Sequence, residues 1–296
     1  METTAARTYA HLPQDEGASQ RASAEACPYD AIFFDMDGTL LPMEIREFLE
    51  AYYQLLGVAA ARAGFDAEEF IDALNAGMLA MGDHEPDCTN ADAFWRTFFS
   101  QLHPGGPTDA QRARVERFVE DFYTHDFGQA GAGVVPNPAA AQAIESLKRK
   151  GYPLYLCTMP MFPLKGVEWR LNWANVDIAL FDRVTTYDNS TAIKPSVAYY
   201  RENALLAGAE PPRILMVGND TSDDLSCLEL GMDVYLVTDF MINRNNYDIS
   251  RVKHGSLADF ATWAEALPPC TSTVACGWHE RATDLLLGAH DIEVKR

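Results

Sequence analysis

The sequence lacks any long apolar run. None of its segments has the length of apolar chain that a membrane-spanning helix needs, and residues 1–30 lack the apolar core of a secretory signal peptide. Positive charge is also scarce, because 23 Lys and Arg stand against 43 Asp and Glu, giving a formal net charge of −20. A polyanion is repelled by nucleic acid and by anionic membranes, so we expect neither as a partner. These absences predict a cytoplasmic protein.

Cysteine is scattered rather than grouped. The six cysteines are Cys27, Cys88, Cys157, Cys227, Cys270 and Cys276. None belongs to a CxxC pair, and the spacing of Cys270 and Cys276 near His279 matches no standard zinc pattern. We therefore expect reduced thiols that are unrelated to one another.

The pattern of apolar residues divides the chain into parts. Residues 1–28 show no period and predict a flexible tail. Residues 43–133 carry apolar side chains at helical spacing and contain no convincing strand, which predicts an all-helical insert. Residues 134–267 alternate between strand-like and helix-like segments, as a parallel sheet with right-handed crossovers requires. Residues 268–296 have no clear place in this pattern.

The expected sheet and its helices belong to an α/β core made of residues 29–42 and 134–267. Strands are expected at 31–34, 153–157, 177–185, 213–217 and 234–237. Helices of this core are expected from Pro138 to Gly151, near 164–173, at 195–206, from the acidic loop at 218–224 to Leu230, and at 257–266. The fold class is thus α/β, with a Rossmann-like parallel sheet and an inserted helical region.

The most informative stretch is 29–41, where an apolar run is followed at once by an acidic loop. Residues 31–34 indicate a buried strand, and Asp35 and Asp37 come directly after it. Open α/β sheets bind their ligands just past the carboxyl ends of strands. Two carboxylates there can hold a divalent cation and leave one oxygen free to attack. In isolation, the same motif would also fit a polar turn in which Asp35 or Thr39 caps a helix.

Further polar residues follow other predicted strands or their linked loops. They are Thr158, Lys194, Asp220, Asp223 and Asp224. Because the carboxyl ends of parallel strands meet at one edge of a sheet, these side chains can converge on the first acidic motif. Taken singly, Thr158 could cap a helix and Lys194 could be a surface lysine.

Together these residue types suit phosphoryl transfer. Asp35 would attack phosphorus and form an aspartyl-phosphate, while Asp37 would protonate the leaving group and then deprotonate water. Thr158 would donate a hydrogen bond to the phosphoryl group, and Lys194 would neutralise its charge. Asp220 would complete an oxygen-rich site of the kind that Mg²⁺ prefers.

Four short motifs in this order carry a family resemblance. They are DMDGTL at 35–40, Thr158 in LYLCTMP, Lys194 before Pro195, and GNDTSDD at 218–224. The chain resembles phosphohydrolases of the haloacid dehalogenase superfamily, with a helical cap of the C1 type at 43–133. The resemblance implies Asp35 as nucleophile, Asp37 as acid/base, and Thr158 and Lys194 as phosphate ligands.

The resemblance also implies a metal site. Mg²⁺ would be held by Asp35, by the backbone carbonyl of Asp37 and by Asp220. Asp224 keeps the expected spacing of four from Asp220 as a second acidic partner, but Asp223 could replace it. A second departure is Met159, which stands where an asparagine commonly follows the threonine.

The leading interpretation is a Mg²⁺-dependent phosphatase that acts on a small phosphorylated metabolite. A phosphomutase or phosphotransferase shares the motifs and differs only in the acceptor. A catalytically silent binding protein would be expected to lose Asp35 or Asp37, and neither is lost. Arg46, Tyr52 and Tyr53 are candidates for substrate contact in the cap. The sequence indicates neither the substrate nor the oligomeric state.

Overall fold

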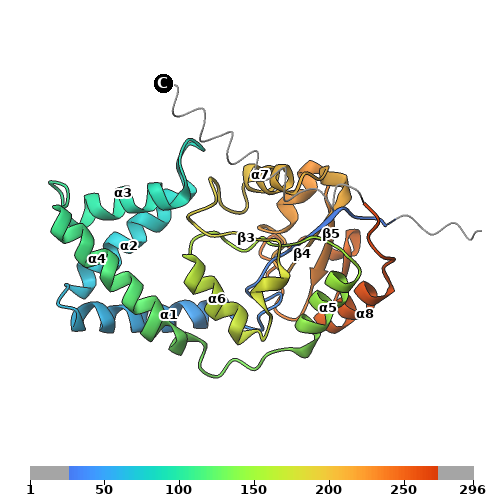
Figure 1. Cartoon of the computed structure of the whole chain (residues 1–296), viewed down its shortest axis with the longest axis horizontal. Coiled ribbons are helices and arrows are strands. Elements are labelled where there is room, and N and C mark those ends of the chain that lie inside the picture. Colours follow the sequence, from blue (N-terminus) through green and yellow to red (C-terminus); the bar gives the residue numbers. More distant parts are fainter. Residues whose placement is uncertain (1–26, 273–296) are drawn as a thin grey trace, which may run out of the picture.

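A parallel sheet of six strands forms the centre of the molecule (Figure 1). The computed structural model describes residues 27–272. The strands are β1 (Ala31–Phe34), β2 (Leu154–Leu156), β3 (Arg183–Val184), β4 (Ile214–Gly218), β5 (Asp233–Val237) and β6 (Lys253–Gly255). Their order is β3-β2-β1-β4-β5-β6, and every neighbouring pair is parallel. The predicted α/β fold is therefore confirmed, with the strand that precedes the acidic motif inside the sheet.

Helices cover both faces of this sheet. Helices α5 (Pro138–Arg149) and α8 (Leu257–Ala266) pack together on one face, and α7 (Val197–Ala207) lies on the other. Successive residues of a strand point to opposite faces. Phe34 accordingly belongs to the first core and Phe33 to the second. A strand buried on both sides has no polar face, which explains the unbroken apolar run of β1.

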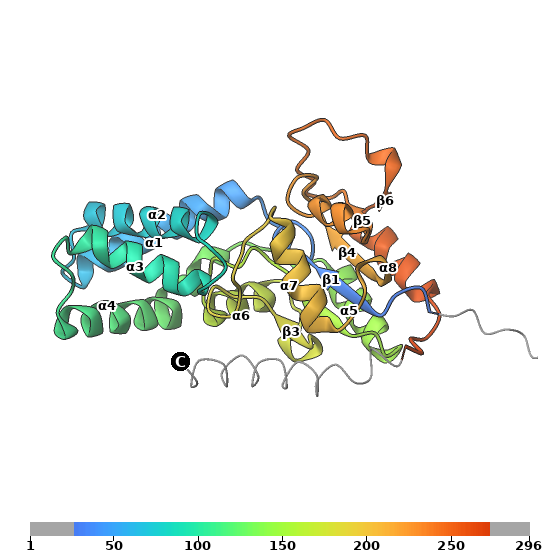
Figure 2. The same ribbon diagram turned by 90° about the horizontal axis from the view of Figure 1, so that it is seen from above.

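A second group of helices lies to one side of the sheet (Figure 2). It comprises α1 (Ile45–Arg62), α2 (Ala67–Gly82), α3 (Asn90–Leu102) and α4 (Asp109–Asp121), followed by a π-helical turn (Phe122–Asp126) and a 3-10 turn (Phe127–Gly131). We call residues 45–131 the helical insert. Capping boxes at Thr89 and Thr108 start its third and fourth helices. Only helices and turns occur between its ends, as the sequence predicted.

The predicted elements differ from the observed ones in three places. The segment after the acidic loop at 218–224 is a 3-10 helix (Leu225–Leu230) that ends at Gly231 with φ +82°. The expected strand at 177–185 shrinks to β3, preceded by a 3-10 turn (Ile178–Leu180). Strand β6 was not predicted, because its sequence Lys-His-Gly has no apolar pattern.

The ends of the described chain correct one prediction. The thiols of Cys27 and Cys270 lie 3.9 Å apart, so these two cysteines are not unrelated. Cys276 and most of the predicted tail and C-terminal extension, 1–28 and 268–296, lie outside the described residues. Within 27–272 we find no helix that is long and apolar enough to cross a membrane.

Candidate active site

The turn after β1 brings Asp35 and Asp37 to the edge of the sheet. Its shape depends on Gly38, whose φ is +81° and whose added Cβ would lie 2.2 Å from Nδ2 of Asn219. Only glycine tolerates both the left-handed conformation and this approach. The hydroxyl of Thr39 lies 3.1 Å from Oδ2 of Asp35 and 3.1 Å from Oδ1 of Asn219. Neither Asp35 nor Thr39 caps a helix, because α1 begins after Glu44.

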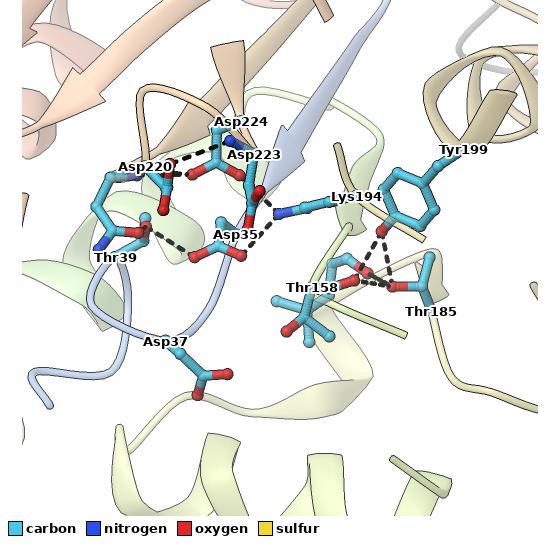
Figure 3. Close-up of polar contacts among 12 residues, drawn as sticks. Asp35, Asp37, Thr39, Thr158, Thr185, Lys194, Tyr199, Asp220, Asp223 and Asp224 are labelled. Carbon is cyan, nitrogen blue, oxygen red and sulfur yellow. Dashed lines mark hydrogen bonds and ion pairs between the residues drawn. The ribbon is translucent and has the colours of Figure 1, made fainter. Parts of the chain in front are cut away.

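Lys194 is an internal cation rather than a surface lysine. Its side chain is 2% exposed, and its Nζ lies 2.7 Å from Oδ1 of Asp35 and 2.7 Å from Oδ1 of Asp224 (Figure 3). Burial opposes its charge, but the two carboxylates outweigh burial and raise the pKa of Lys194 well above its usual value. The lysine therefore stays charged between the carboxylates of Asp35 and Asp224.

Asp224 is the most heavily bonded of the acidic side chains. Its Oδ2 accepts hydrogen bonds from the backbone N–H groups of Asn219 and Asp220, both at 2.9 Å, and its Oδ1 accepts from Lys194. Burial raises the pKa of Asp224 to about 7 against the opposing effect of Lys194. Both oxygens serve the protein, so Asp224 holds the loop and the lysine in place.

Asp220 keeps more of its coordinating capacity than Asp224. Its Oδ1 accepts from the backbone N–H groups of Ser222 at 2.7 Å and Asp223 at 3.1 Å, and these bonds turn the side chain inward. Burial and the neighbouring Asp220 charge raise the pKa of Asp223. Of the residues in this loop, Asp220 is the better candidate for a metal ligand.

Asp37 is held by an arginine that no sequence pattern had singled out. Arg170 lies on α6 (Leu164–Trp173), is 1% exposed, and donates from Nη1 to Oδ2 of Asp37 at 2.6 Å. Its Nε donates to the carbonyl of Gly166, and its guanidinium carbon lies 4.4 Å from the ring centroid of Phe162. Burial raises the pKa of Asp37, and Arg170 opposes that rise. No motif marks this arginine, because it lies within a helix that is distant in sequence from the acidic loops.

Two orphaned atoms accompany this ion pair. Within the described chain, Oδ1 of Asp37 and Nη2 of Arg170 are buried and have no hydrogen-bond partner. A buried polar atom without a partner costs free energy, about 1–3 kcal/mol for a typical group. The site thus holds one Asp37 oxygen in place and leaves the other available to a ligand.

Thr158 lies past the end of β2 and is fully buried. Its carbonyl accepts from the hydroxyls of Tyr199 at 2.8 Å and Thr185 at 3.0 Å (Figure 3). Its own Oγ1 has no partner among the described residues. Thr158 does not cap a helix, because α6 begins after Pro163. It is also absent from the lining of the cavity described next.

A cavity of about 200 Å³ unites the other predicted site residues. Its polar lining consists of Asp35, Asp37, Asp220, Asp223, Asp224, Lys194, Arg170 and Asn219. Its apolar lining consists of Ile45, Leu49, Met78, Met159, Met161, Phe162 and Ile242. The suggested cap contacts Arg46, Tyr52 and Tyr53 do not line this cavity: Arg46 is exposed, Tyr52 is buried among aromatic rings, and the Tyr53 hydroxyl donates to Asn75.

The donor set of this cavity fits a divalent cation. Five aspartates face two cationic side chains there, which leaves an excess of negative charge. No group of three or more His, Cys, Asp or Glu side chains within 27–272 has the geometry of a metal site. Mg²⁺ needs no such cluster, because it binds through one or two carboxylates and keeps several waters. Asp35 and Asp220 could supply those carboxylates.

Comparisons with known proteins place the motifs in a family. A family model described as hydrolase, haloacid dehalogenase-like hydrolase, matches residues 29–230, a range that includes every aspartate of the cavity. No curated protein matches the chain.

Solved structures with similar folds have low sequence identity to this chain. One is a predicted phosphoglycolate phosphatase from Haemophilus somnus, with 20% identity, 80% of this chain and 98% of that chain covered, and a TM-score of 0.47. Another is a HAD phosphatase from Thermococcus onnurineus, with 20% identity, 81% and 99% covered, and a TM-score of 0.48. A third is L-2-haloacid dehalogenase from Xanthobacter autotrophicus, with 14% identity, 79% and 88% covered, and a TM-score of 0.41.

Proposed function

Because this chain belongs to the haloacid dehalogenase-like hydrolase family, we propose that it is a Mg²⁺-dependent phosphatase that hydrolyses a small phosphorylated metabolite. The observation that carries this proposal is that Asp35, Asp37 and Lys194 line one cavity. A carboxyl group at Asp37 serves a leaving oxygen that needs a proton. A leaving halide needs none, so this residue favours an ester of phosphate as substrate.

The first half of the reaction is transfer to Asp35. A carboxylate oxygen of Asp35 forms a bond to phosphorus, and the bond from phosphorus to the ester oxygen breaks. The electron pair goes to that oxygen, which takes a proton from the carboxyl group of Asp37. Arg170 already occupies Oδ2 of Asp37, so Oδ1 is the oxygen available for this proton.

The second half restores the protein. Asp37, now a carboxylate, accepts a proton from a water molecule whose oxygen attacks phosphorus. The bond between phosphorus and Asp35 breaks, which releases inorganic phosphate and regenerates the carboxylate. Asp37 thus acts first as acid and then as base while its ion pair with Arg170 is kept.

The remaining polar groups stabilise phosphoryl oxygens. Lys194 lies 2.7 Å from the nucleophile and would bind a phosphoryl oxygen next to it. The unpartnered hydroxyl of Thr158 is the candidate for a second donor. Mg²⁺, held by Asp35, Asp220 and the backbone carbonyl of Asp37, would supply positive charge to the same oxygens.

We also propose a division of the chain into a catalytic core and a cap. Residues 29–42 and 134–267 would form the catalytic core, and residues 43–133 would form a cap that covers the substrate. The support for it is that Ile45, Leu49 and Met78 of the helical insert line the same cavity as the catalytic aspartates. We also propose a cytoplasmic location, because no apolar run has the length of a signal peptide or a membrane span. The net charge of −20 supports the proposal that neither nucleic acid nor an anionic membrane is a partner.

Hydrolysis of phenyl phosphate by the full chain tests the function, with Mg²⁺ and then with a chelator. We expect metal-dependent release of phosphate, and a loss of at least about 10⁴-fold in kcat for Asp35→Asn, because an amide is not a nucleophile. Phosphate that passes to an added sugar instead of water would indicate a phosphotransferase. Turnover that survives in Asp35→Asn would refute the covalent route.

A further inference from the structure

The cavity has two chemically distinct walls. One wall is formed by the edge of the sheet and by Arg170 of α6, which together supply every charged group. The other wall consists of Ile45 and Leu49 from α1, Met78 from α2, and Met161 and Phe162 from the loop after β2. All of the insert lies within the described residues, and it contributes no charged or hydrogen-bonding side chain to the cavity lining.

Asn219 is the neutral polar side chain of the cavity lining, and each end of its amide already has one protein partner. Asn219 accepts from the hydroxyl of Thr39 through Oδ1 and donates to the carbonyl of Phe240 through Nδ2. The wall formed by the insert therefore offers a substrate hydroxyl no amide or hydroxyl partner. The charged groups lie around Asp35 and Asp37, where the phosphoryl group would bind, and the unpartnered Oδ1 of Asp37 and Nη2 of Arg170 belong to that side of the cavity.

The space behind the apolar wall is apolar as well. A second void of about 30 Å³ shares Met78, Met161 and Phe162 with the first cavity. Beyond them it is lined by further aromatic and aliphatic side chains, among which the hydroxyls of Tyr52 and Tyr123 lie 3.4 Å from each other. Methionines are flexible and adapt their shape to an apolar guest. A longer alkyl or aryl group would contact the side chains that separate the two cavities, and the methionines among them could adapt to it.

We propose that the group esterified to phosphate is an apolar alkyl or aryl group rather than a polyhydroxylated sugar. This inference rests on the proposed phosphatase function and specifies its substrate class. A buried hydroxyl without a partner weakens binding, whereas each buried methylene strengthens it. The volume of about 200 Å³ restricts the group to a small one.

Propyl phosphate and glycerol phosphate make a matched pair, because both have three carbons and only the second carries two hydroxyls. We expect kcat/KM of the wild-type chain with Mg²⁺ to favour propyl phosphate by about 10-fold or more. Along the series from methyl to propyl phosphate we expect a rise of about fourfold per methylene, which corresponds to ~0.8 kcal/mol. Neither comparison depends on a variant that must fold.

A pair of variants locates the preference. Met78→Gln places an amide on the apolar wall and should narrow the ratio of propyl to glycerol phosphate by several-fold. Leu79→Gln, the next residue on α2, is the control, because Leu79 is 77% exposed and lies outside the cavity lining. The control should leave the ratio unchanged.

Three results would count against the inference. If both esters are turned over with equal efficiency, or glycerol phosphate is preferred, the apolar class is wrong and the phosphatase function stands. If Met78→Gln folds and leaves the ratio unchanged, the insert does not form the recognition wall. If neither ester, nor phenyl phosphate, releases phosphate, the proposed function is wrong and this inference falls with it.

Discussion

The edge of the sheet and the helical insert are stabilised by different interactions. The edge concentrates charge, and ion pairs connect its side chains in a chain of contacts from Asp35 through Lys194 to Asp224. The insert concentrates aromatic rings, such as Phe70 and Phe98 with centroids 5.1 Å apart. The first region depends on direction and distance, and the second depends on volume.

This contrast predicts different consequences for substitutions in the two regions. A carboxylate or an ammonium group fails if it moves by an ångström, because hydrogen bonds depend steeply on geometry. An apolar wall tolerates exchange of one side chain for another of similar volume. We therefore expect substitutions at the edge to change kcat, and substitutions on the insert to change substrate preference or stability.

The largest of these effects should come from the pair of Asp37 and Arg170. Asp37→Asn should lower kcat by about 10²–10⁴-fold, because the acid and base are lost. Arg170→Met should lower kcat by a similar order, because Asp37 loses the partner that holds its Oδ2 at 2.6 Å. The double variant should be little worse than Asp37→Asn alone, since Arg170 acts through Asp37.

The double-mutant cycle in kcat distinguishes an arginine that positions Asp37 from one that only stabilises the fold. A purely structural arginine would add its effect to that of Asp37→Asn in kcat. Thermal unfolding of all four proteins serves as the control, because a buried partner that is removed can itself destabilise the fold. Additive losses in kcat would contradict the positioning role.

A second test compares two aspartates of the same loop. Asp220→Asn should raise the Mg²⁺ concentration that gives half-maximal activity, because Asp220 is the proposed ligand. Asp224→Asn should instead lower the free energy of unfolding by about 1.5–3 kcal/mol, since its carboxylate accepts a charged bond from Lys194. Metal titration of activity and chemical denaturation measure the two effects. If Asp224→Asn shifts the metal requirement and Asp220→Asn does not, the two roles must be exchanged.

The smallest effect on catalysis is expected inside the insert. Gly77→Ala would place a Cβ 2.6 Å from Cδ2 of Phe94, so it should lower stability by about 1–3 kcal/mol. Gly57→Ala is the matched control in α1, where the added Cβ would lie 3.4 Å from Cδ1 of Ile71. Removing a helical glycine there should stabilise the chain by about 0.5–1 kcal/mol. Equal melting temperatures for the two variants would contradict the packing described here.

The sequence predicted those parts of the fold whose signal is local. The apolar run of β1 and the cap and stop signals around α5 located both elements, and α8 was predicted at its observed bounds. Strand β6 was not predicted, because an edge strand with exposed Lys253 and His254 needs no apolar pattern. The contact between Cys27 and Cys270 escaped because it joins positions 243 residues apart.

The same distinction between local and long-range signals applies to the residues of the site. Residues in the loops that follow strands could be selected, because topology brings Asp35, Lys194 and Asp220 to one edge. Arg170 could not, because its helix carries no motif and its contact with Asp37 spans 133 positions. The apolar wall was equally hidden, since only packing decides that Leu49 and Met78 face the cavity while Tyr52 does not.

Trapping the covalent intermediate tests the central claim most directly. The full chain would be quenched during turnover of phenyl phosphate with Mg²⁺ and treated with borohydride, which reduces an acyl phosphate to an alcohol. Peptide mass spectrometry should then find Asp35 converted to homoserine, and no such change in protein quenched without substrate. Steady release of phosphate with Asp35 unmodified, or with another aspartate converted in its place, would contradict the account.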